Sequence, residues 1–318
     1  MRFSLHLFII LLASSAGCQL TLVADGVPNA TAMTDVGIQI APESVNFQAT
    51  RPFRVIATPS PTTQPSPVAT ATPIPTFTPT PLPQTFVVGQ TVAGRDIVAH
   101  RYGDGEAMIM LIGGIHGGWE ANTVELIQQL MRHFETHPES IVPGVSFLLI
   151  PVLNPDGLAA GRDINSRFNG NTVDLNRNWG CGWSAEAFWR DQHVDPGSQP
   201  FSEPETQAVA ALIRWVQPSV VLFYHSAAKG VFAGHCDGGE VSDEMAAVYG
   251  EAAGYEYGGD FTAYPVTGTG PSWVDGLGIP SADVELATKT ATEFAQNLRA
   301  IIALQCWLVG ADDIDICE

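Results

Sequence analysis

The sequence predicts an α/β domain with a mixed, largely parallel central sheet and helices on both of its faces. From about residue 85 onward, short apolar runs alternate with stretches of helical periodicity. This alternation is typical of parallel strands joined by helices. Polar residues of the kinds that bind metals and substrates also fall where the apolar runs end. Sites in such folds gather at the carboxyl ends of the strands, so this second observation supports the same fold class.

The strands are predicted from short apolar runs, one of them rich in β-branched residues. Continuous runs of this kind indicate strands that are buried on both faces of a sheet. The four expected strands are Met108–Ile112, Ser146–Pro151, Ser219–Tyr224 and Ala282–Leu286.

The helices are predicted from the helical spacing of apolar residues between and after these runs. Pro204 suits the first turn of a helix, and Ser202 or Glu203 before it can serve as the cap. The four expected helices are Ala121–Phe134, Pro204–Val216, Ser242–Ala253 and Thr290–Leu308.

Residues 1–18 are predicted to be an export signal, because Arg2 precedes an apolar core that is too short to span a bilayer. The ending Ala16-Gly17-Cys18 resembles a bacterial lipoprotein processing site, although Ser15 stands where such sites more often carry Leu. Cleavage there would leave Cys18 as a lipidated first residue, held on a membrane surface. An ordinary signal peptide that is cut nearby is the alternative.

A Pro- and Thr-rich segment without charged residues, 58–84, separates the N-terminal part from the rest of the chain. Because Pro favours extended backbone and lacks an N–H donor, this segment is expected to be a stiff linker. Residues 19–57 show no clear period and have no assigned role. Residues 85–318 have the size of one ordinary domain, which is expected to carry the activity.

The chain is strongly acidic, with 33 acidic and 14 basic residues and a net charge of −19. This charge argues against nucleic acid as a partner, and against anionic membrane surfaces. Contact with a membrane is therefore expected only through a lipid on Cys18. The protein is expected to be exported and monomeric.

Four cysteines follow Cys18 in the chain, an even number that suggests two disulfides in an exported domain. The expected pairs are Cys181 with Cys236, from their positions alone, and Cys306 with Cys317, which would close a short C-terminal loop. None of them has the Cys-x-x-Cys spacing of a structural zinc site.

His116 and Glu120 lie together on the loop after the first apolar run, separated by two glycines and a tryptophan. His225 stands at the end of the third run. A catalytic zinc takes three protein ligands and keeps one position for water, and these side chains would supply two imidazoles and a carboxylate. A polar loop with one hydrogen-bonded histidine is the alternative.

Further polar residues could bind substrate or move protons. Arg167, Asn176 and Arg177 lie in an Asn-rich loop, where guanidinium groups ten residues apart could bind two negative groups of one ligand. Glu285 interrupts an apolar strand, and a carboxylate there could act as a general base. Tyr264 lies in a Gly- and Pro-rich loop that could fold over a substrate. The alternatives are a hydrogen-bonded surface loop and a strand register that points Glu285 to solvent.

Together these segments resemble the zinc carboxypeptidases related to carboxypeptidase A, especially their bacterial exported members. The resemblance covers about 86–308, and Tyr264 and Glu285 follow the motifs at suitable spacing. In chain order the motifs are Gly113-Gly114-Ile115-His116-Gly117, Asn154-Pro155-Asp156-Gly157, Val173-Asp174-Leu175-Asn176-Arg177-Asn178-Trp179, Pro200-Phe201-Ser202-Glu203-Pro204-Glu205 and His225-Ser226.

The resemblance implies one zinc ion bound by His116, Glu120 and His225. It implies that Glu285 takes a proton from a zinc-bound water and delivers it to the leaving amine. Arg167 would stabilise the oxyanion of the tetrahedral intermediate, a kind of contact whose loss typically lowers the rate about a hundredfold or more.

The resemblance also implies that Asn176 and Arg177 hold the terminal carboxylate of the substrate, and that Tyr264 closes over it. One departure concerns the metal site, because the family usually has two residues between its first His and its Glu. Here three intervene, and Trp119 stands where Glu is expected. We expect the glycine-flanked loop to absorb the extra residue, so that Glu120 reaches the metal.

The expected function is that of a zinc metallopeptidase that hydrolyses C-terminal peptide bonds, on peptides or peptidoglycan stem peptides. Two alternatives remain open. Zinc-dependent deacylases of N-acyl amino acids, similar to succinylglutamate desuccinylase and aspartoacylase, share a related metal motif. The altered spacing between His116 and Glu120 would also suit an inactive cell-surface binding module.

Overall fold

The computed structural model describes residues 82–237, 241–258, 261, 263–310 and 317. The expected signal peptide, Cys18, residues 19–57 and nearly all of the 58–84 linker lie outside the described residues. Among the residues that are described, no helix is both long and apolar enough to cross a membrane.

An eight-stranded sheet forms the centre of the domain, in the order β1-β2-β4-β3-β7-β10-β8-β9. The four strands predicted from the sequence are its central, mutually parallel members. The inner strands are β3 (Ala107–Ile112), β4 (Val145–Ile150), β7 (Val220–Ser226) and β10 (Ser281–Leu286). The expected mixed and largely parallel sheet is thereby confirmed.

The outer strands were not predicted. They are more exposed than the inner strands and lack long apolar runs, so a search for buried strands misses them. The pairs β1–β2, β2–β4 and β10–β8 are antiparallel, and only β8–β9 is parallel. The outer strands are β1 (Thr85–Gln90), β2 (Asp96–Gly103), β8 (Gly230–Ala233) and β9 (Glu256–Tyr257), and a separate hairpin joins β5 (Ala187–Trp189) to β6 (Gln192–Val194).

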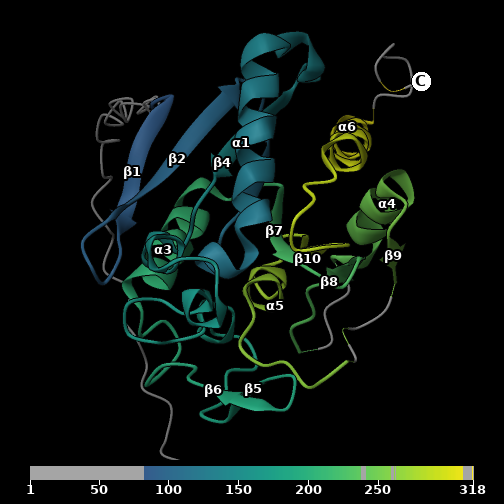
Figure 1. The fold of residues 1–318 in the computed structure, drawn as a ribbon. Helices are drawn as coiled ribbons and strands as arrows, with labels where there is room; N and C mark the ends of the chain where they lie inside the picture. Colours follow the sequence, from purple (N-terminus) through teal and green to yellow (C-terminus); the bar gives the residue numbers. More distant parts are fainter. Residues whose placement is uncertain (1–81, 238–240, 259–260, 262, 311–316, 318) are drawn as a thin grey trace, which may run out of the picture. The chain divides into compact units, whose positions relative to one another are not determined.

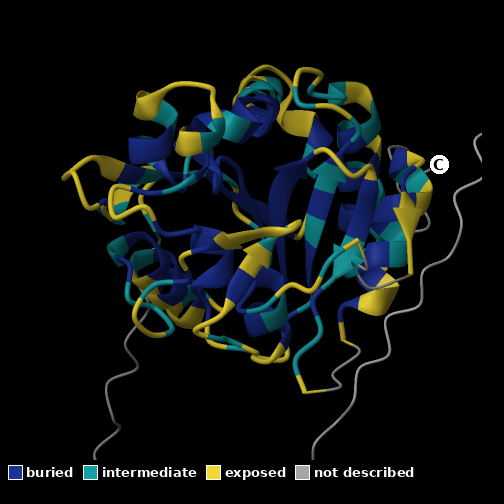
Figure 2. Ribbon diagram, turned by 60° about the horizontal axis from the view of Figure 1, so that its bottom comes forward, coloured by how far each residue is buried: buried dark blue, intermediate teal, exposed yellow. Residues whose placement is uncertain are grey.

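Helices cover both faces of the sheet, as the sequence predicts (Figure 1). Alternate side chains of the central strands point to opposite faces, which gives two apolar clusters. One cluster packs against α1 (Ala121–Thr136), α4 (Asp243–Ala253) and α6 (Phe294–Val309), and the other against α3 (Pro204–Val216) and α5 (Gly270–Asp275). Figure 2 shows the central strands buried between these layers.

Helix α6 begins four residues later than predicted, at Phe294 instead of Thr290. Side-chain hydrogen bonds to the backbone hold the preceding segment in a loop. The backbone N–H groups of Thr290 and Ala291 donate to the hydroxyl of Thr288, and the N–H of Ala287 donates to the carboxylate of Glu293. Such contacts compete with helix formation.

The segment from Tyr264 to Trp273, predicted to be a loop, ends in a short helix. Helix α5 begins at Gly270, with the Thr269 hydroxyl as its cap and a proline in the first turn. Ser272 contributes to this cap through contacts with Thr269, so it supports the local packing. The remaining short elements are the α-helix α2 (Pro155–Ala160) and the 3-10 turns η1 (Gly117–Glu120), η2 (Pro138–Ser140), η3 (Ile164–Arg167) and η4 (Leu175–Arg177).

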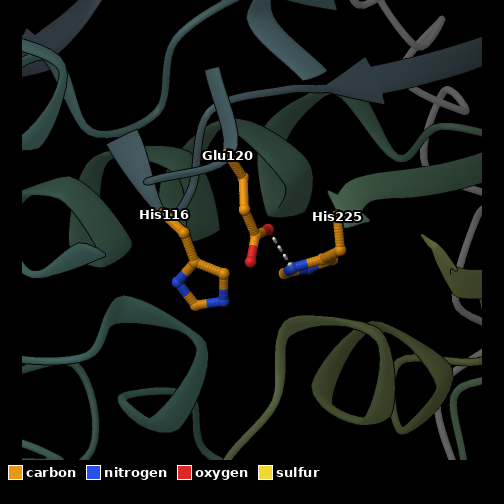
Figure 3. A group of neighbouring side chains, drawn as sticks. All are labelled: His116, Glu120 and His225. Atoms are coloured by element: carbon orange, nitrogen blue, oxygen red, sulfur yellow. Dashed lines mark ion pairs between the residues drawn. The ribbon is translucent and has the colours of Figure 1, made fainter. Parts of the chain in front are cut away.

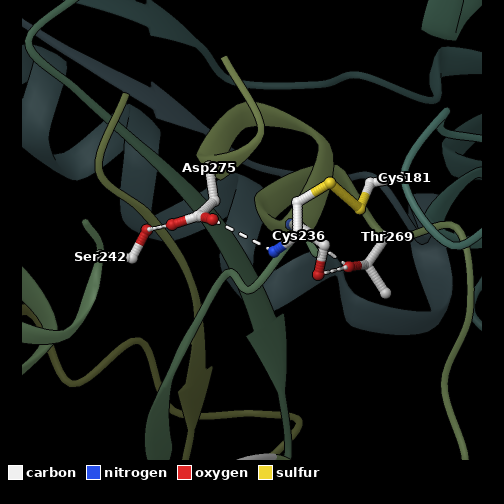
Figure 4. The surroundings of a disulfide bond; sticks show 6 residues. Cys181, Cys236, Ser242, Thr269 and Asp275 are labelled. Carbon is white, nitrogen blue, oxygen red and sulfur yellow. Dashed lines mark hydrogen bonds between the residues drawn. A yellow bond between two sulfur atoms is a disulfide. The ribbon is translucent and has the colours of Figure 1, made fainter. Parts of the chain in front are cut away.

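Both expected disulfides are present, Cys181 with Cys236 and Cys306 with Cys317. The first joins two segments that are 55 residues apart in sequence. Figure 4 shows this bridge beside α5, where Asp275 accepts hydrogen bonds from the backbone N–H of Cys236 and from the hydroxyl of Ser242. Asp275 therefore holds the segment after β8 against α5, and the bridge joins the same segment to the loop that carries Cys181.

Candidate metal centre and active site

The predicted site residues meet at the carboxyl ends of the central strands. His116 follows β3, and His225 and Glu285 stand near the ends of β7 and β10, directly opposite each other in the register. A cavity of about 530 Å³ opens here. All eight residues proposed from the sequence line it: His116, Glu120, Arg167, Asn176, Arg177, His225, Tyr264 and Glu285.

Three of these residues form a cluster that could hold a metal ion. One ligand atom from each of His116, Glu120 and His225 lies within 4.8 Å of the others, and all three residues are buried. Figure 3 shows the side chains converging on a common point. Glu120 Oε2 lies 3.3 Å from His225 Nδ1, and His116 Nδ1 is buried without a hydrogen-bond partner among the described residues. Two imidazoles and one carboxylate match the ligands that catalytic zinc sites use.

The extra residue between His116 and Glu120 is accommodated by the 3-10 turn η1. Gly117 has a φ of +48°, and a Cβ there would lie 2.6 Å from the backbone of Gly157. A Cβ on Gly118 would overlap the carbonyl oxygen of a neighbouring loop. Only glycines fit this tight turn, which brings the Glu120 carboxylate back toward the histidines. The turn also places Trp119 edge-to-face with Trp189, with ring centroids 6.0 Å apart.

Two cations lie beside Glu120 and favour its ionised form. Arg167 Nη1 is 3.6 Å and Lys289 Nζ is 3.5 Å from Glu120 Oε1. Burial opposes ionisation, but His116, His225 and Arg167 together hold the pKa of Glu120 well below its ordinary value. The carboxylate is therefore charged and ready to bind a cation.

The two histidines have opposite protonation tendencies. Burial, reinforced by Arg167, keeps the pKa of His116 well below its ordinary value. Burial also disfavours a charge on His225, but Asp283 and Glu120 outweigh it and raise the pKa of His225 to about 10. Asp283 Oδ1 is 2.9 Å from His225 Nε2. This contact leaves Nδ1 of His225 facing Glu120, on the side where a metal would bind.

Glu285 lies in the same cavity and keeps a raised affinity for protons. Burial and the charge of Glu120 raise the pKa of Glu285 to about 7. Its Oε2 accepts a hydrogen bond of 3.1 Å from the backbone N–H of Ala228. A carboxyl group with a pKa near neutrality suits a residue that accepts and then returns a proton.

The residues proposed to bind a substrate carboxylate lie on another side of His225. Asn176 Nδ2 is 3.3 Å from Asp283 Oδ2, and Asn176 Oδ1 accepts a hydrogen bond from the N–H of Gly270. Arg177 donates three hydrogen bonds to the carbonyl oxygens of Phe188 and Asn176, which leaves one further N–H on each terminal nitrogen. These contacts fix the direction of both side chains at the cavity.

Three charged residues of the site have no role in the sequence-based prediction. Asp174 binds Arg167 through two hydrogen bonds of 3.0 and 2.8 Å, and its other oxygen lies 3.6 Å from His116 Nδ1. Asp283 stands two residues before Glu285, and that spacing places both on one face of a strand. Lys289 is one of only two lysines in the chain. The spacing of Asp283 was a usable signal, whereas nothing in the sequence placed Lys289 at the cavity.

Comparison with known proteins agrees with this geometry. A family model described as zinc carboxypeptidase matches residues 82–302. Bacteriocin BCN5 of Clostridium perfringens is 27% identical over 245 residues, which cover 71% of this chain and 26% of that protein. Murein peptide amidase A of Escherichia coli (strain K12) is 33% identical over 129 residues, which cover 36% of this chain and 48% of the relative.

The fold also occurs in a solved structure. The crystal structure of carboxypeptidase A from Helicoverpa armigera superposes with a TM-score of 0.60 at 17% identity, covering 72% of this chain and 69% of that chain. The matches to the two curated relatives span 26% and 48% of their own lengths. The family match thus extends over most of the described domain, whereas the chain spans less than half the length of each of the two curated relatives.

Proposed function

Because the chain belongs to the zinc carboxypeptidase family, we propose that it is a zinc metallopeptidase that hydrolyses C-terminal peptide bonds. One observation carries this proposal most directly. Glu285, with a pKa raised to about 7, shares a cavity with the buried cluster of His116, Glu120 and His225. A carboxylate poised for proton transfer beside a three-ligand metal site is the arrangement that hydrolysis by an activated water requires.

The cluster of His116, Glu120 and His225 would hold one zinc ion. When bound, zinc acts as a Lewis acid and lowers the pKa of water in its open position to about 7. Glu285 then accepts the proton of the attacking water and returns it to the leaving amine. Arg167, fixed by Asp174, donates to the developing oxyanion.

Asn176, Arg177 and Tyr264 are proposed to hold the free carboxylate of the substrate. Arg177 keeps one N–H on each terminal nitrogen available for an anion, and the Asn176 amide lines the same cavity. Burial raises the pKa of Tyr264, so its hydroxyl remains a hydrogen-bond donor at neutral pH. Together these side chains would select the carboxyl-terminal residue of a peptide.

The substrate is proposed to be a peptide or a peptidoglycan stem peptide. The relative named murein peptide amidase A supports the second of these. From the sequence alone we propose that the protein is exported, carries a lipid on Cys18 and has a linker (58–84) ahead of a catalytic domain (85–318). We also propose that it is a monomer. Two disulfides among the described residues agree with an extracytoplasmic location.

The proposed inactive binding module is less well supported, because Glu120 lies in the cluster that could hold a metal despite the extra residue. A deacylase of N-acyl amino acids is separated from a peptidase by assay. The exported chain should be supplied with α-linked peptides, γ-linked peptides and N-acyl amino acids, each with and without a chelator. Chelator-sensitive release of a C-terminal residue supports the proposal. Turnover of N-acyl amino acids alone would replace it with the deacylase.

The pH dependence of hydrolysis should show that Glu285 acts as the base. Without metal its pKa is raised to about 7, and a bound cation would lower that value, because positive charge opposes protonation. Since only the carboxylate accepts a proton, kcat/KM should fall about tenfold per pH unit below the midpoint, which lies at or below about 7. The residual activity of Glu285→Gln should lack this acid limb. A rate that rises toward acid pH would contradict the assignment.

Replacing Asp283 by Asn should weaken zinc binding about 10- to 100-fold, the usual effect of losing a group that orients a metal ligand. Asp283 Oδ1 lies 2.9 Å from His225 Nε2 and fixes the imidazole. Affinity is measured by competition with a chelator of known strength. Asp243→Asn is the matched control, since Asp243 forms a 2.8 Å pair with His235 away from the cavity. Equal zinc affinity in both variants would rule out a positioning role for Asp283.

A further inference from the structure

Basic side chains gather along one part of the cavity, which is unusual in so acidic a chain. Only 14 of the 318 residues are Lys or Arg, and the net charge is −19. Four of these basic residues line this single cavity: Arg167, Arg177, Arg190 and Lys289. Arg177 is assigned to the terminal carboxylate of the substrate, and Arg167, paired with Asp174, is assigned to the oxyanion. Lys289 and Arg190 therefore require a separate explanation.

Two tryptophans contact Lys289, Arg190 and Arg167 at the cavity. Trp119, the extra residue of the metal-binding loop, lies edge-to-face with Trp189, with ring centroids 6.0 Å apart. Lys289 Nζ stands 4.0 Å from the Trp119 ring. The guanidinium groups of Arg167 and Arg190 lie 5.1 and 4.9 Å from the Trp189 ring. Such cation–π contacts place the cations without neutralising them.

Several donors of this cluster have no acidic partner. Arg190 forms no hydrogen bond or ion pair with any described residue, and it is exposed at the cavity. Its φ of +60° is a left-handed conformation that most side chains avoid. Lys289 Nζ uses two contacts, with Glu120 Oε1 at 3.5 Å and the carbonyl oxygen of Ser226 at 3.2 Å. A third ammonium N–H therefore remains.

Four acids line the same cavity as the four basic residues, and three of these acids have other roles in the proposed site. Glu120 is a proposed metal ligand, Asp283 pairs with His225, and Glu285 is the proposed base. The fourth acid, Asp191, is next to Arg190 in sequence but forms no ion pair with it in the described structure. A bound zinc ion would add two further positive charges. An anionic group of the substrate would therefore be stabilised on this side.

Lys289 lies on the side of the metal site away from the terminal carboxylate. Asn176 Nδ2 approaches Nε2 of His225, whereas Glu120 Oε2 approaches Nδ1 on the opposite edge of the same ring. Lys289 sits next to Glu120. A substrate whose terminal carboxylate lies at Asn176, and whose scissile bond lies at the metal, must place its acyl part toward Lys289.

From this arrangement we infer that Lys289 and Arg190 form a subsite for a second substrate carboxylate, on the acyl side of the scissile bond. The inference rests on the proposed peptidase function. Two kinds of residue present such a carboxylate. In an α-linked glutamate it ends the side chain, and in a γ-linked glutamate it is the α-carboxylate.

Matched substrates distinguish the α-linked from the γ-linked glutamate. The first pair is acetyl-Glu-Ala and acetyl-Gln-Ala, and the second pair has the same residues joined through the γ-carboxyl group, with the α-carboxyl group free or amidated. For each pair the readout is kcat/KM for the acid divided by kcat/KM for the amide. We expect this ratio to reach about tenfold or more in at least one pair, the size of one charge-assisted hydrogen bond. The pair with the higher ratio identifies the linkage.

The variants Arg190→Gln and Lys289→Gln should each bring this ratio toward one. Arg299→Gln, which removes an exposed arginine on α6, is the matched control and should keep the wild-type ratio. Lys289→Gln also disturbs Glu120, but loss of zinc lowers the rates for acid and amide substrates together and leaves the ratio unchanged. Calorimetric binding of the acidic and amidated peptides to Glu285→Gln gives a readout without turnover.

A ratio near one for both pairs, or a ratio that Arg190→Gln and Lys289→Gln leave unchanged, would overturn the subsite while peptide hydrolysis itself stands. Failure of the proposed function looks different, because no peptide would then be cleaved in a zinc-dependent way. Added salt should also lower the acid-to-amide ratio in the wild type, since partly exposed charges are screened. A ratio that rises with salt would contradict the subsite.

Discussion

Replacing Glu285 by Gln should lower kcat for peptide hydrolysis about 10²- to 10⁴-fold, the usual contribution of a positioned general base. Gln keeps the shape of the side chain but cannot accept a proton. The variant should still bind one zinc ion per chain, because Glu285 is not one of the three residues in the metal cluster. Rates are measured on the peptide that the wild type cleaves best, with zinc content determined in the same samples.

The matched control for this substitution is Glu125→Gln. Glu125 is a partly exposed acid on α1 that pairs with Arg162 at 2.8 Å, outside the cavity. It should retain the wild-type rate. If Glu285→Gln keeps full activity with normal zinc content, another group must accept the proton, and the assigned role of Glu285 is wrong.

Replacing Glu120 by Gln should remove stoichiometric zinc and, with it, the activity. The amide is a poor metal ligand, and Arg167 and Lys289 would face a neutral group. Zinc at about 100 times its Kd should raise the free energy of unfolding of the wild type by about 2.7 kcal/mol. The variant should show a much smaller rise at the same zinc concentration, measured by thermal unfolding with and without zinc.

Glu205→Gln serves as the buried control for this experiment. Glu205 is fully buried and accepts hydrogen bonds from Asn169 and from the backbone N–H of Val92, but it does not line the cavity. It should lose stability without losing zinc. If the Glu120→Gln variant instead binds one zinc ion and is stabilised by it as much as the wild type, His116 and His225 suffice for zinc binding.

The sequence predicts the inner strands because their environment is uniform. Strand β3 is a continuous apolar run, and four of its six residues are buried. Strand β2, with the sequence DIVAHRYG, is partly exposed and mixes charged with apolar residues. Its place in the sheet is decided by pairing with β1 and β4. Strand β1 has no clear sequence pattern, and β4 is distant in the sequence. Burial on both faces leaves a clear pattern, whereas pairing at a sheet edge does not.

The same contrast applies to the site. His116, His225 and Glu285 stand out because polar groups at the ends of buried strands are costly unless they are paired. Lys289 reaches the cavity from the irregular segment before α6, whose path depends on hydrogen bonds to Thr288 and Glu293. No local pattern encodes that path. The position of Trp119 likewise depends on Trp189, which is distant in the sequence.

The central claim is that Glu120 completes a three-ligand zinc site although one extra residue separates it from His116. The most direct test is a crystal structure of the zinc-loaded protein, with anomalous scattering measured at the zinc edge. One zinc peak is expected within about 2.0–2.2 Å of a ring nitrogen of His116, a ring nitrogen of His225 and a carboxylate oxygen of Glu120. A zinc ion bound by the histidines alone, with Glu120 turned toward Lys289 and Arg167, would contradict the claim.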